Sequence, residues 1–406
     1  MRRIPGFPAA LIAAALSFVP VATACADQVG ETLYPIGDRT SMWADPYLIG
    51  SLRHVSEIFA SRPVRRGETV SVLPRGEQLL TLVYDLGDAR FGLDDYLERS
   101  RTTGLIVVKD GRIVLERYRL GADDRSLLMS MSVSKSFVST LVGFAIGDGL
   151  IATVDDPIDA YLPELRGSGY DGVPIKAVLQ MSSGVDFFES YGTPDSDFNR
   201  MWNESLRDNK TPIHRFVRET KRLRAPYERF YYAAVETLAL GWLVSRVTGK
   251  TLSAYMSEKL WGPLGMESDA AWMTDGQGEN AGEAAFCCLS ATLRDYARFG
   301  LLMAQDGVWQ GTRLLPAGWV RAATHPEGPQ VQPGKLAQGY GIGYQYHWWT
   351  LPDAFLARGV NGQFIYVNPA EQLVIVIASA WPVWWSGVLE NHTFALFDAV
   401  AEKLHR

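Results

Sequence analysis

Cysteine is scarce in this sequence, and recognisable metal-binding motifs are missing. Only 3 cysteines and 6 histidines occur in 406 residues. The histidines are scattered and form no His-Glu-x-x-His motif, so we expect neither a metal nor another cofactor. Cys287 and Cys288 are adjacent, and a bridge between neighbours closes only a trivial loop. We therefore interpret this pair as two small apolar core residues, with their oxidation state left open.

The chain also lacks an excess of basic residues. Lys and Arg total 39 against 45 Asp and Glu, which gives a formal net charge of -6. Binding to phosphate backbones needs a basic surface, so nucleic acid is not an expected partner. Apolar residues make up 47% and charged residues 21% of the chain, as in ordinary globular proteins. This composition excludes a disordered or collagen-like protein, and it says nothing of the oligomeric state.

No apolar run is long enough to cross a bilayer comfortably. A basic start at Arg2 is followed by an apolar stretch over residues 9–21 and by the small residues Ala24-Cys25-Ala26. This order is typical of a secretory signal peptide, which we place at residues 1–26. We therefore expect export to the periplasm or beyond. Lipoprotein processing at Cys25 is the alternative, although the residues before it lack the usual leucine.

The remaining chain divides into an extension and one large domain. Residues 27–95 show no clear period and are expected to form an N-terminal extension, and residues 96–406 form the main domain. Strands are predicted at both ends of this domain and helices between them, over about 150–300. The predicted strands are 104–108, 113–118, 364–367 and 373–377, and the predicted helices are 132–145, 237–247, 291–303 and 391–403. This order predicts an α+β fold whose antiparallel sheet uses both ends of the chain.

The strongest chemical signal is the motif Ser132-Val-Ser-Lys135 at the start of an apolar helix. Residues three apart share one helix face, so the hydroxyl and the amine point the same way. A serine is a weak nucleophile until a base takes its proton, and a lysine can act as that base when burial lowers its pKa. No other lysine in the sequence has a serine three places before it. We predict that Ser132 is a nucleophile and that Lys135 activates it.

This motif resembles that of the serine β-lactamase and penicillin-binding protein superfamily. The sequence is similar to its branch of class C β-lactamases, related carboxylesterases and 6-aminohexanoate-dimer (nylon-oligomer) hydrolases, from about residue 100 to the C-terminus. The run Ser290-Ala-Thr-Leu-Arg-Asp-Tyr-Ala-Arg-Phe-Gly300 is also typical of this branch. The resemblance implies a β-lactamase-like fold, in which helices flank an antiparallel sheet and a helical subdomain is inserted. It also implies hydrolysis through a covalent acyl-enzyme.

The second motif of the superfamily is Tyr-x-Asn, and here the sequence departs from it. The resemblance identifies Tyr232 as the tyrosine that shares acid-base work with Lys135, with Tyr231 as the alternative. Ala234 stands where the asparagine is expected, and its side chain cannot form hydrogen bonds. This change weighs more against β-lactam turnover than against simple acyl transfer. A literal Tyr-x-Asn occurs at 366–368, where the strand-turn context indicates a structural role.

The third motif, Lys-Thr-Gly, is absent. The corresponding stretch is Arg358-Gly-Val-Asn361-Gly362-Gln363, which resembles the Gly-Gly-Gln version of the esterase and amidase branch. The resemblance implies that the Gln363 N–H joins that of Ser132 as an oxyanion donor, that Gly362 lets the substrate approach the strand, and that Asn361 binds substrate. Val360 replaces the cation that would bind a substrate carboxylate, which favours an ester or an uncharged amide.

Further residues are predicted to line the substrate pocket. The resemblance implies that Tyr191 hydrogen-bonds a substrate amide, and Trp348 is expected to line an apolar acyl pocket with neighbouring aromatic residues, with core packing as the alternative. Asp186 and Glu189 are interpreted as solvated or loop-capping residues. The predicted function is thus a cofactor-independent serine hydrolase acting on a small ester or amide. The alternatives are a β-lactamase or D-Ala-D-Ala peptidase, and a non-catalytic binding or sensor protein.

Overall fold

The computed structural model describes residues 34–79, 81–336 and 341–405. The predicted signal peptide, with Cys25, lies outside these residues. Within the described residues, no helix combines the length and apolar character needed to cross a membrane.

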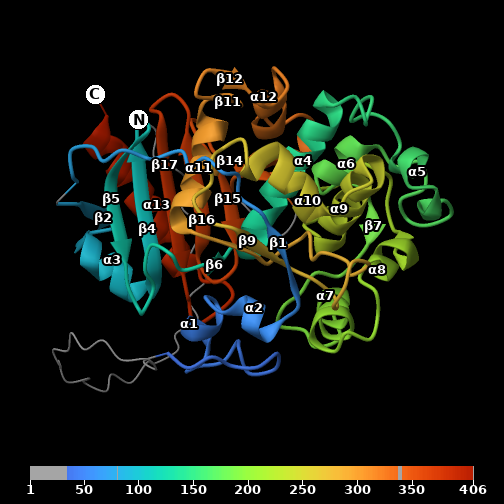
Figure 1. Ribbon diagram of the computed structural model, residues 1–406, viewed down its shortest axis with the longest axis horizontal. Coiled ribbons are helices and arrows are strands. Elements are labelled where there is room, and N and C mark those ends of the chain that lie inside the picture. Colours follow the sequence, from blue (N-terminus) through green and yellow to red (C-terminus); the bar gives the residue numbers. More distant parts are fainter. Residues whose placement is uncertain (1–33, 80, 337–340, 406) are drawn as a thin grey trace.

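One large antiparallel sheet forms the framework (Figure 1). Its strand order is β13-β14-β15-β16-β17-β4-β5, so strands from both ends of the main domain meet where β17 pairs with β4. The strands are β13 Gly343–Gln345, β14 Trp348–Thr350, β15 Phe355–Gly359, β16 Gln363–Asn368, β17 Leu373–Ser379, β4 Thr102–Lys109 and β5 Arg112–Tyr118. The predicted antiparallel α+β arrangement is confirmed.

The β4–β5 hairpin follows directly from its sequence. Asp110 and Gly111 connect the strands, and both have positive φ angles, 50° and 71°. Two positive φ angles in a two-residue loop match the right-handed twist of the flanking strands, which is why Asp-Gly is favoured there. The strand residues then alternate between two apolar layers, with Ile106 in one hydrophobic cluster and Val107 in the other.

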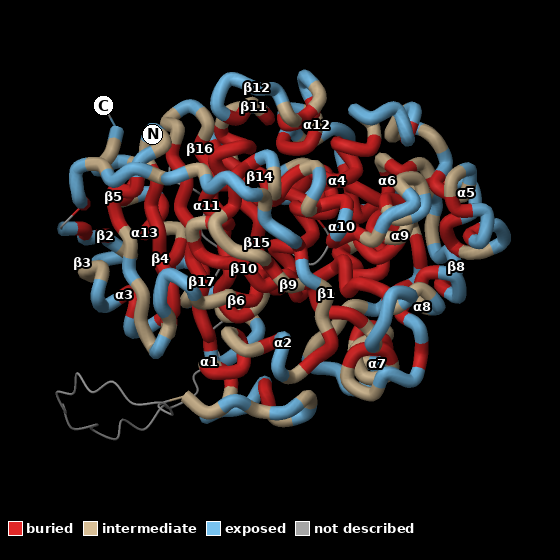
Figure 2. Tube along the Cα trace, viewed as in Figure 1, coloured by how far each residue is buried: buried red, intermediate tan, exposed pale blue. Residues whose placement is uncertain are grey.

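Each face of the sheet is covered by a helix. Helix α11 (Leu293–Ala304) packs against β17, β16 and β4, and helix α13 (Gly387–Leu404) covers the opposite face. On the α13 side, Phe397 stacks on Tyr366, with ring centroids 4.7 Å apart. The literal Tyr-x-Asn at 366–368 is therefore part of the sheet core. Figure 2 shows that the strands and the central helices are largely buried, whereas the loops around them are exposed.

The helical part lies beside the sheet and is centred on α9 (Ala234–Thr248), which contacts α4 (Ser134–Gly147) and several shorter helices. Helix α9 ends at Gly249, whose φ of 64° is the left-handed cap expected from the sequence. The other α-helices are α1 Leu48–Ser51, α2 Val55–Ile58, α3 Leu93–Arg99, α5 Ile158–Tyr161, α6 Ile175–Leu179, α7 Asp197–Met201, α8 His214–Glu219, α10 Leu252–Met256 and α12 Trp319–Thr324.

A second, four-stranded sheet connects the N-terminal segment to the rest of the chain. Its order is β1-β9-β10-β6, and β1 pairs antiparallel with β9. Its strands are β1 Ser61–Val64, β9 Ala270–Met273, β10 Leu289–Ala291 and β6 Leu128–Met129. Three further pairs are short: β2 Val83–Leu86 with β3 Ala89–Gly92, β7 Val185–Asp186 with β8 Lys221–Arg222, and β11 Val308–Trp309 with β12 Thr312–Arg313.

The run 290–300 has a structural explanation. Thr292 caps α11 by accepting a hydrogen bond from the Asp295 N–H, and the buried Asp295 carboxylate pairs with Arg298 at 2.8 Å. The Tyr296 hydroxyl donates to the carbonyls of Leu128 in β6 and Leu289 in β10. These contacts join α11 to the four-stranded sheet, whose strand β6 comes just before Ser132 in the chain.

Gly300 lets α11 lie directly on the large sheet. A Cβ atom at this position would come within 2.5 Å of Val374 Cγ1 and 3.1 Å of Ile365 Cγ2, both on buried strands. We expect Gly300→Ala to destabilise the protein by about 1–3 kcal/mol, because branched side chains fixed in the sheet must move. Gly387→Ala is the control, since its Cβ would meet nothing within 4 Å. Denaturant unfolding measures both, and a Gly300→Ala variant as stable as the parent would contradict this packing.

Candidate active site

Ser132 lies in a short 3-10 turn, η1 (Met131–Val133), immediately before α4. The turn is reached through Met131, whose φ of 48° is unusual for a residue with a side chain. The Ser130 N–H donates to the Leu289 carbonyl at 2.7 Å, which ties the turn to β10. An unusual backbone angle persists where surrounding structure enforces it, and such angles cluster at functional sites. The hydroxyl of Ser132 is thus presented by a constrained turn rather than by the helix interior.

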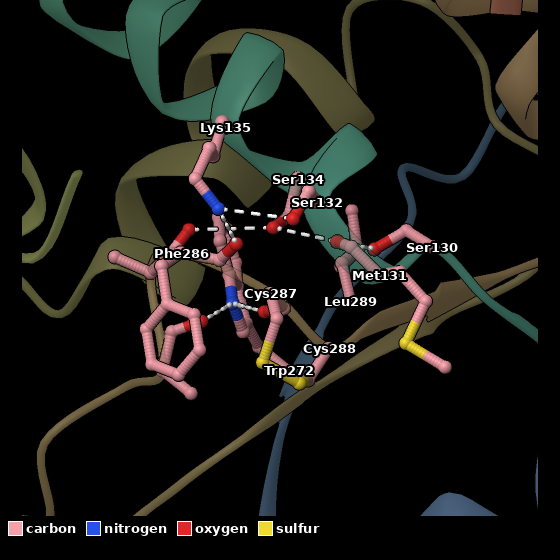
Figure 3. Close-up of a disulfide and its surroundings, with 12 residues drawn as sticks. Ser130, Met131, Ser132, Ser134, Lys135, Trp272, Phe286, Cys287, Cys288 and Leu289 are labelled. Carbon is pink, nitrogen blue, oxygen red and sulfur yellow. Dashed lines mark hydrogen bonds between the residues drawn. A yellow bond between two sulfur atoms is a disulfide. The ribbon is translucent and has the colours of Figure 1, made fainter. Parts of the chain in front are cut away.

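Lys135 is one turn further along, and its amine is buried beside Ser132 (Figure 3). Its Nζ lies 3.0 Å from Ser132 Oγ and donates to the Phe286 carbonyl at 2.7 Å. The hydroxyl of Ser134, between them, donates to the carbonyls of Met131 and Ala285. The expected juxtaposition of the serine and lysine side chains is present.

The surroundings of Lys135 decide its charge. Burial lowers the pKa of Lys135 to about 7, and the negative charge of Glu189 opposes this shift. The charge of Lys135 also acts on the buried His347: burial, followed by this charge, lowers the pKa of His347 well below its usual value. A lysine with a pKa near 7 is partly neutral at physiological pH, so its amine can accept a proton from a hydroxyl.

Cys287 and Cys288 follow the carbonyl that holds Lys135. Both are buried, as the sequence predicts, but the structure joins them in a disulfide. Interpreting them only as apolar core residues misses this bond, because sequence spacing gives no reason to pair adjacent cysteines. The Cys287 carbonyl accepts a hydrogen bond from the indole of Trp272 at 3.0 Å. The segment 285–288 is therefore tied both to α4 and to β9.

Tyr232 lies just before α9, with its ring close to Lys135. The distance from Lys135 Nζ to the ring centroid of Tyr232 is 5.0 Å. The same ring stacks on Trp349, at a centroid distance of 5.8 Å and an interplanar angle of 24°. Trp349 in turn lies against the Arg358 guanidinium, 4.4 Å from the ring centroid. This stack fixes the plane of the phenol beside the amine. Tyr231, the alternative, is half-buried, and its N–H donates to the Met181 carbonyl.

Glu189 takes an unexpected place in this cluster. It lies between β7 and α7, and its Oε2 accepts a hydrogen bond from the Ala234 N–H at 2.8 Å. Its Oε1 accepts one from the Tyr191 hydroxyl at 2.9 Å. Burial raises the pKa of Glu189, and the charge of Lys135 opposes this. Glu189 is half-buried and its carboxylate accepts the first N–H of α9, so of the two interpretations the capping role agrees with the structure. Asp186 is exposed, as expected.

The turn between β15 and β16 approaches the backbone of Ser132. A Cβ atom on Gly359 would come within 3.0 Å of the Ser132 nitrogen, so only glycine allows this approach. Gln363 pairs with Gly359 across the hairpin, and its side-chain amide donates to the carbonyls of Asn361 and Ser379. The Asn361 amide donates to the Trp381 carbonyl at 3.0 Å.

Backbone conformation and packing account for the glycine at position 362 without reference to a substrate. Gly362 has a φ of 85°, which favours glycine, and the indole of Trp381 occupies the space where a Cβ would lie. Trp348 is fully buried and packs against Phe299 and Phe355, with ring centroids 5.7 Å and 5.1 Å away. Its neighbour Trp349 is the tryptophan that lies beside Tyr232.

His347 is a residue that the sequence analysis does not single out. It lies between β13 and β14, where its ring nitrogens are 3.2 Å from the Tyr344 hydroxyl and 3.3 Å from the Thr237 hydroxyl. Its carbonyl accepts a hydrogen bond from Ser136 on α4 at 2.7 Å. The residues next to His347 in the sequence do not predict this buried position, because its contacts come from three separate elements, β13, α9 and α4.

Together these groups have the composition of an acyl-transfer site. A hydroxyl, an amine with a lowered pKa and a phenol ring lie within one buried cluster, and these are the groups that activation of a serine nucleophile requires. Among the described residues, no group of three or more His, Cys, Asp or Glu side chains could hold a metal ion.

Comparison with known proteins agrees with this chemistry. The family model described as Beta-lactamase matches residues 93–396. The 6-aminohexanoate-dimer hydrolase of Paenarthrobacter ureafaciens is 32% identical over 302 residues, which cover 71% of this chain and 75% of that protein.

Two solved structures extend the likeness to the fold. One, from Bacillus anthracis and assigned as a 6-aminohexanoate-dimer hydrolase, has a TM-score of 0.81 at 24% identity, covering 91% of this chain and 98% of its own. A family VIII carboxylesterase has a TM-score of 0.55 at 17% identity, covering 73% of this chain and 91% of its own.

The lowered pKa of Lys135 predicts how the reactivity of Ser132 depends on pH. Below a pH of about 7 the amine is protonated and cannot accept the serine proton, and above it the amine is neutral. We expect the rate of Ser132 labelling by a fluorophosphonate to rise with pH through about 7 and then level off. Lys135→Arg should abolish the labelling, because a guanidinium stays protonated. A labelling rate that stays constant from acidic to alkaline pH would contradict this role of Lys135.

Proposed function

The chain belongs to the beta-lactamase family, and from this premise we propose that it is a serine hydrolase that cleaves esters or small uncharged amides through an acyl-enzyme. The observation that carries the proposal is the buried amine of Lys135, 3.0 Å from the Ser132 hydroxyl. A serine beside a base of lowered pKa is the arrangement that acyl transfer requires.

In the proposed first step, Ser132 Oγ attacks the substrate carbonyl carbon as its proton passes to Lys135. The tetrahedral intermediate then collapses, and the alcohol or amine leaves after accepting a proton from Lys135 or Tyr232. Water attacks the acyl-enzyme in the second step, with the same groups acting as base and then returning the proton to Ser132 Oγ. The acid is released, and the enzyme regains its starting protonation state.

The oxyanion is proposed to bind between backbone N–H groups. The Ser132 N–H, just before α4, is one donor, and the β15–β16 turn supplies the second, for which Gln363 is our candidate. The close packing of Gly359 on the Ser132 backbone supports this role of the turn.

The charges near this turn favour an uncharged substrate. Val360 stands where relatives with Lys-Thr-Gly carry a cation. The nearest cation along the strand, Arg358, is paired with Glu390 at 2.6 Å and lies against the rings of Trp349 and Trp385. A guanidinium already engaged in this way is a poor partner for a substrate carboxylate, which weighs against β-lactams and cell-wall peptides.

An amide substrate is the second candidate within the same chemistry. The relative from Paenarthrobacter ureafaciens is named a 6-aminohexanoate-dimer hydrolase, so a linear amide is a reasonable test compound. Tyr191 is then proposed to accept a hydrogen bond from the amide N–H, since its hydroxyl proton is donated to Glu189.

We expect the purified protein to hydrolyse short p-nitrophenyl esters and Ser132→Ala to lose this activity by a factor of about 1,000 or more, on the order seen when a nucleophile is removed. Ser139→Ala is the control, because it lies in the same helix and its hydroxyl has no hydrogen-bond partner among the described residues. Rapid turnover of nitrocefin would favour a β-lactamase instead. Stable labelling by penicillin without turnover would favour a peptidase or a sensor.

The two adjacent tyrosines provide a second test. Tyr232→Phe removes the phenol beside Lys135, and we expect kcat to fall by roughly 100-fold to 10,000-fold, the range for a lost acid-base group. Tyr231→Phe should change kcat by only a small factor. Steady-state kinetics on one p-nitrophenyl ester compares the variants, and equal losses would overturn the assignment to Tyr232.

A further inference from the structure

The Tyr-x-Asn motif lacks its asparagine, and a side chain from elsewhere in the chain contacts the backbone at this position. Ala234 brings no polar side chain to the start of α9. Its N–H is nevertheless occupied, because it donates to Glu189 Oε2 at 2.8 Å. A carboxylate from the loop between β7 and α7 thus contacts the residue that replaces the asparagine.

Both oxygens of Glu189 have partners. The second, Oε1, accepts from the Tyr191 hydroxyl at 2.9 Å, and the Tyr191 ring packs on Phe198, with centroids 4.6 Å apart. Hydrogen bonds to both oxygens hold the carboxylate in one orientation and favour its charged form. Asp186, at the end of β7 and three residues before Glu189, is exposed and therefore offers a matched comparison.

The charged and titratable groups around this pair can be named. The Tyr232 ring lies beside the Lys135 amine, which also donates to the Phe286 carbonyl. The charge of Glu189 acts on the pKa of Lys135, and the charge of Lys135 acts on the pKa of His347. The Tyr191 hydroxyl donates to the Glu189 carboxylate, and the charge of Lys135 opposes the rise that burial causes in the pKa of Glu189. The charge of Glu189 acts on the pKa of Tyr231. In this group Glu189 is the acidic side chain that acts on Lys135, and it raises the pKa of the amine against the effect of burial.

We propose that Glu189 is a positioning residue that caps the start of α9, two residues after Tyr232, and balances the positive charge that Lys135 gains when it takes the serine proton. This inference deepens the proposed function and rests on it. The carboxylate acts through Lys135 and does not touch the reacting atoms.

A residue with only a structural role would leave the pH dependence of activity unchanged, whereas the charge of Glu189 is expected to affect it. Glu189→Gln keeps the size of the side chain and an acceptor for the Ala234 N–H but removes the negative charge. The protonated form of Lys135 then loses its stabilisation, so the acidic limb of the pH profile should move to lower pH. We expect a shift of about one pH unit, so that at a fixed pH on the acidic limb kcat/KM, taken as a fraction of its own plateau, differs from that of the parent by a factor of about ten. The plateau itself should fall, because a weaker base accepts the serine proton less readily.

The test measures kcat/KM for a p-nitrophenyl ester against pH in the parent and its variants. Glu189→Gln should show the shift, whereas Asp186→Asn and the parent should share one profile. Glu189→Asp keeps the charge, so its limb should stay closer to that of the parent. An unshifted limb in a folded Glu189→Gln variant would overturn the inference. If that variant does not fold, Tyr191→Phe, which removes a donor to the carboxylate, should shift the limb in the same direction.

A second readout separates this inference from the proposed function. The titration of Lys135 can be followed by NMR on protein with 13C-labelled lysine, assigned with a Lys135→Met variant, and it needs no turnover. If the parent hydrolyses no ester or amide, the proposed function fails, and the effect of Glu189 on Lys135 is still measured. If Lys135 titrates at the same pH in the parent and in Glu189→Gln, the role of Glu189 fails whatever the activity.

Discussion

The organising constraint in this protein is the burial of one amine. Lys135 can be enclosed only because a carbonyl, a hydroxyl and an aromatic ring surround its Nζ, each from a different part of the chain. Burying an unpaired charge would cost several kcal/mol, so the lysine responds by a lowered pKa and the protein by providing partners. The segment before β10 brings Phe286 to the site, and the segment before α9 brings Tyr232.

The sequence reveals the local parts of this arrangement and not the distant ones. The hairpin around Asp110, the cap at Gly249 and the Ser132–Lys135 pair are all visible, because each depends on residues a few positions apart. Tyr232 is identified only through its resemblance to a motif.

The remaining site residues depend on distant contacts. The place of Glu189 comes from burial and from an N–H at position 234, and no pattern in a single sequence records either. Trp348 and Trp349 look equivalent in the sequence, since alternation alone does not tell which of two neighbours faces a site. The structure assigns Trp348 to the core and Trp349 to the ring of Tyr232.

The aromatic residues join the two halves of the molecule. The stack that runs from Arg358 through Trp349 to Tyr232 starts on β15 of the large sheet and ends beside α9 of the helical part. A movement of the sheet relative to the helices would therefore displace the phenol. The many aromatic residues, which from composition could serve either core or pocket, here do both.

The bond between Cys287 and Cys288 closes a ring with no intervening residues, so it removes almost no freedom from the unfolded chain. Its influence is therefore confined to the few backbone atoms beside it, and these adjoin the carbonyl that holds Lys135. In this protein the disulfide thus lies next to the surroundings of a buried amine and contributes little to the stability of the fold.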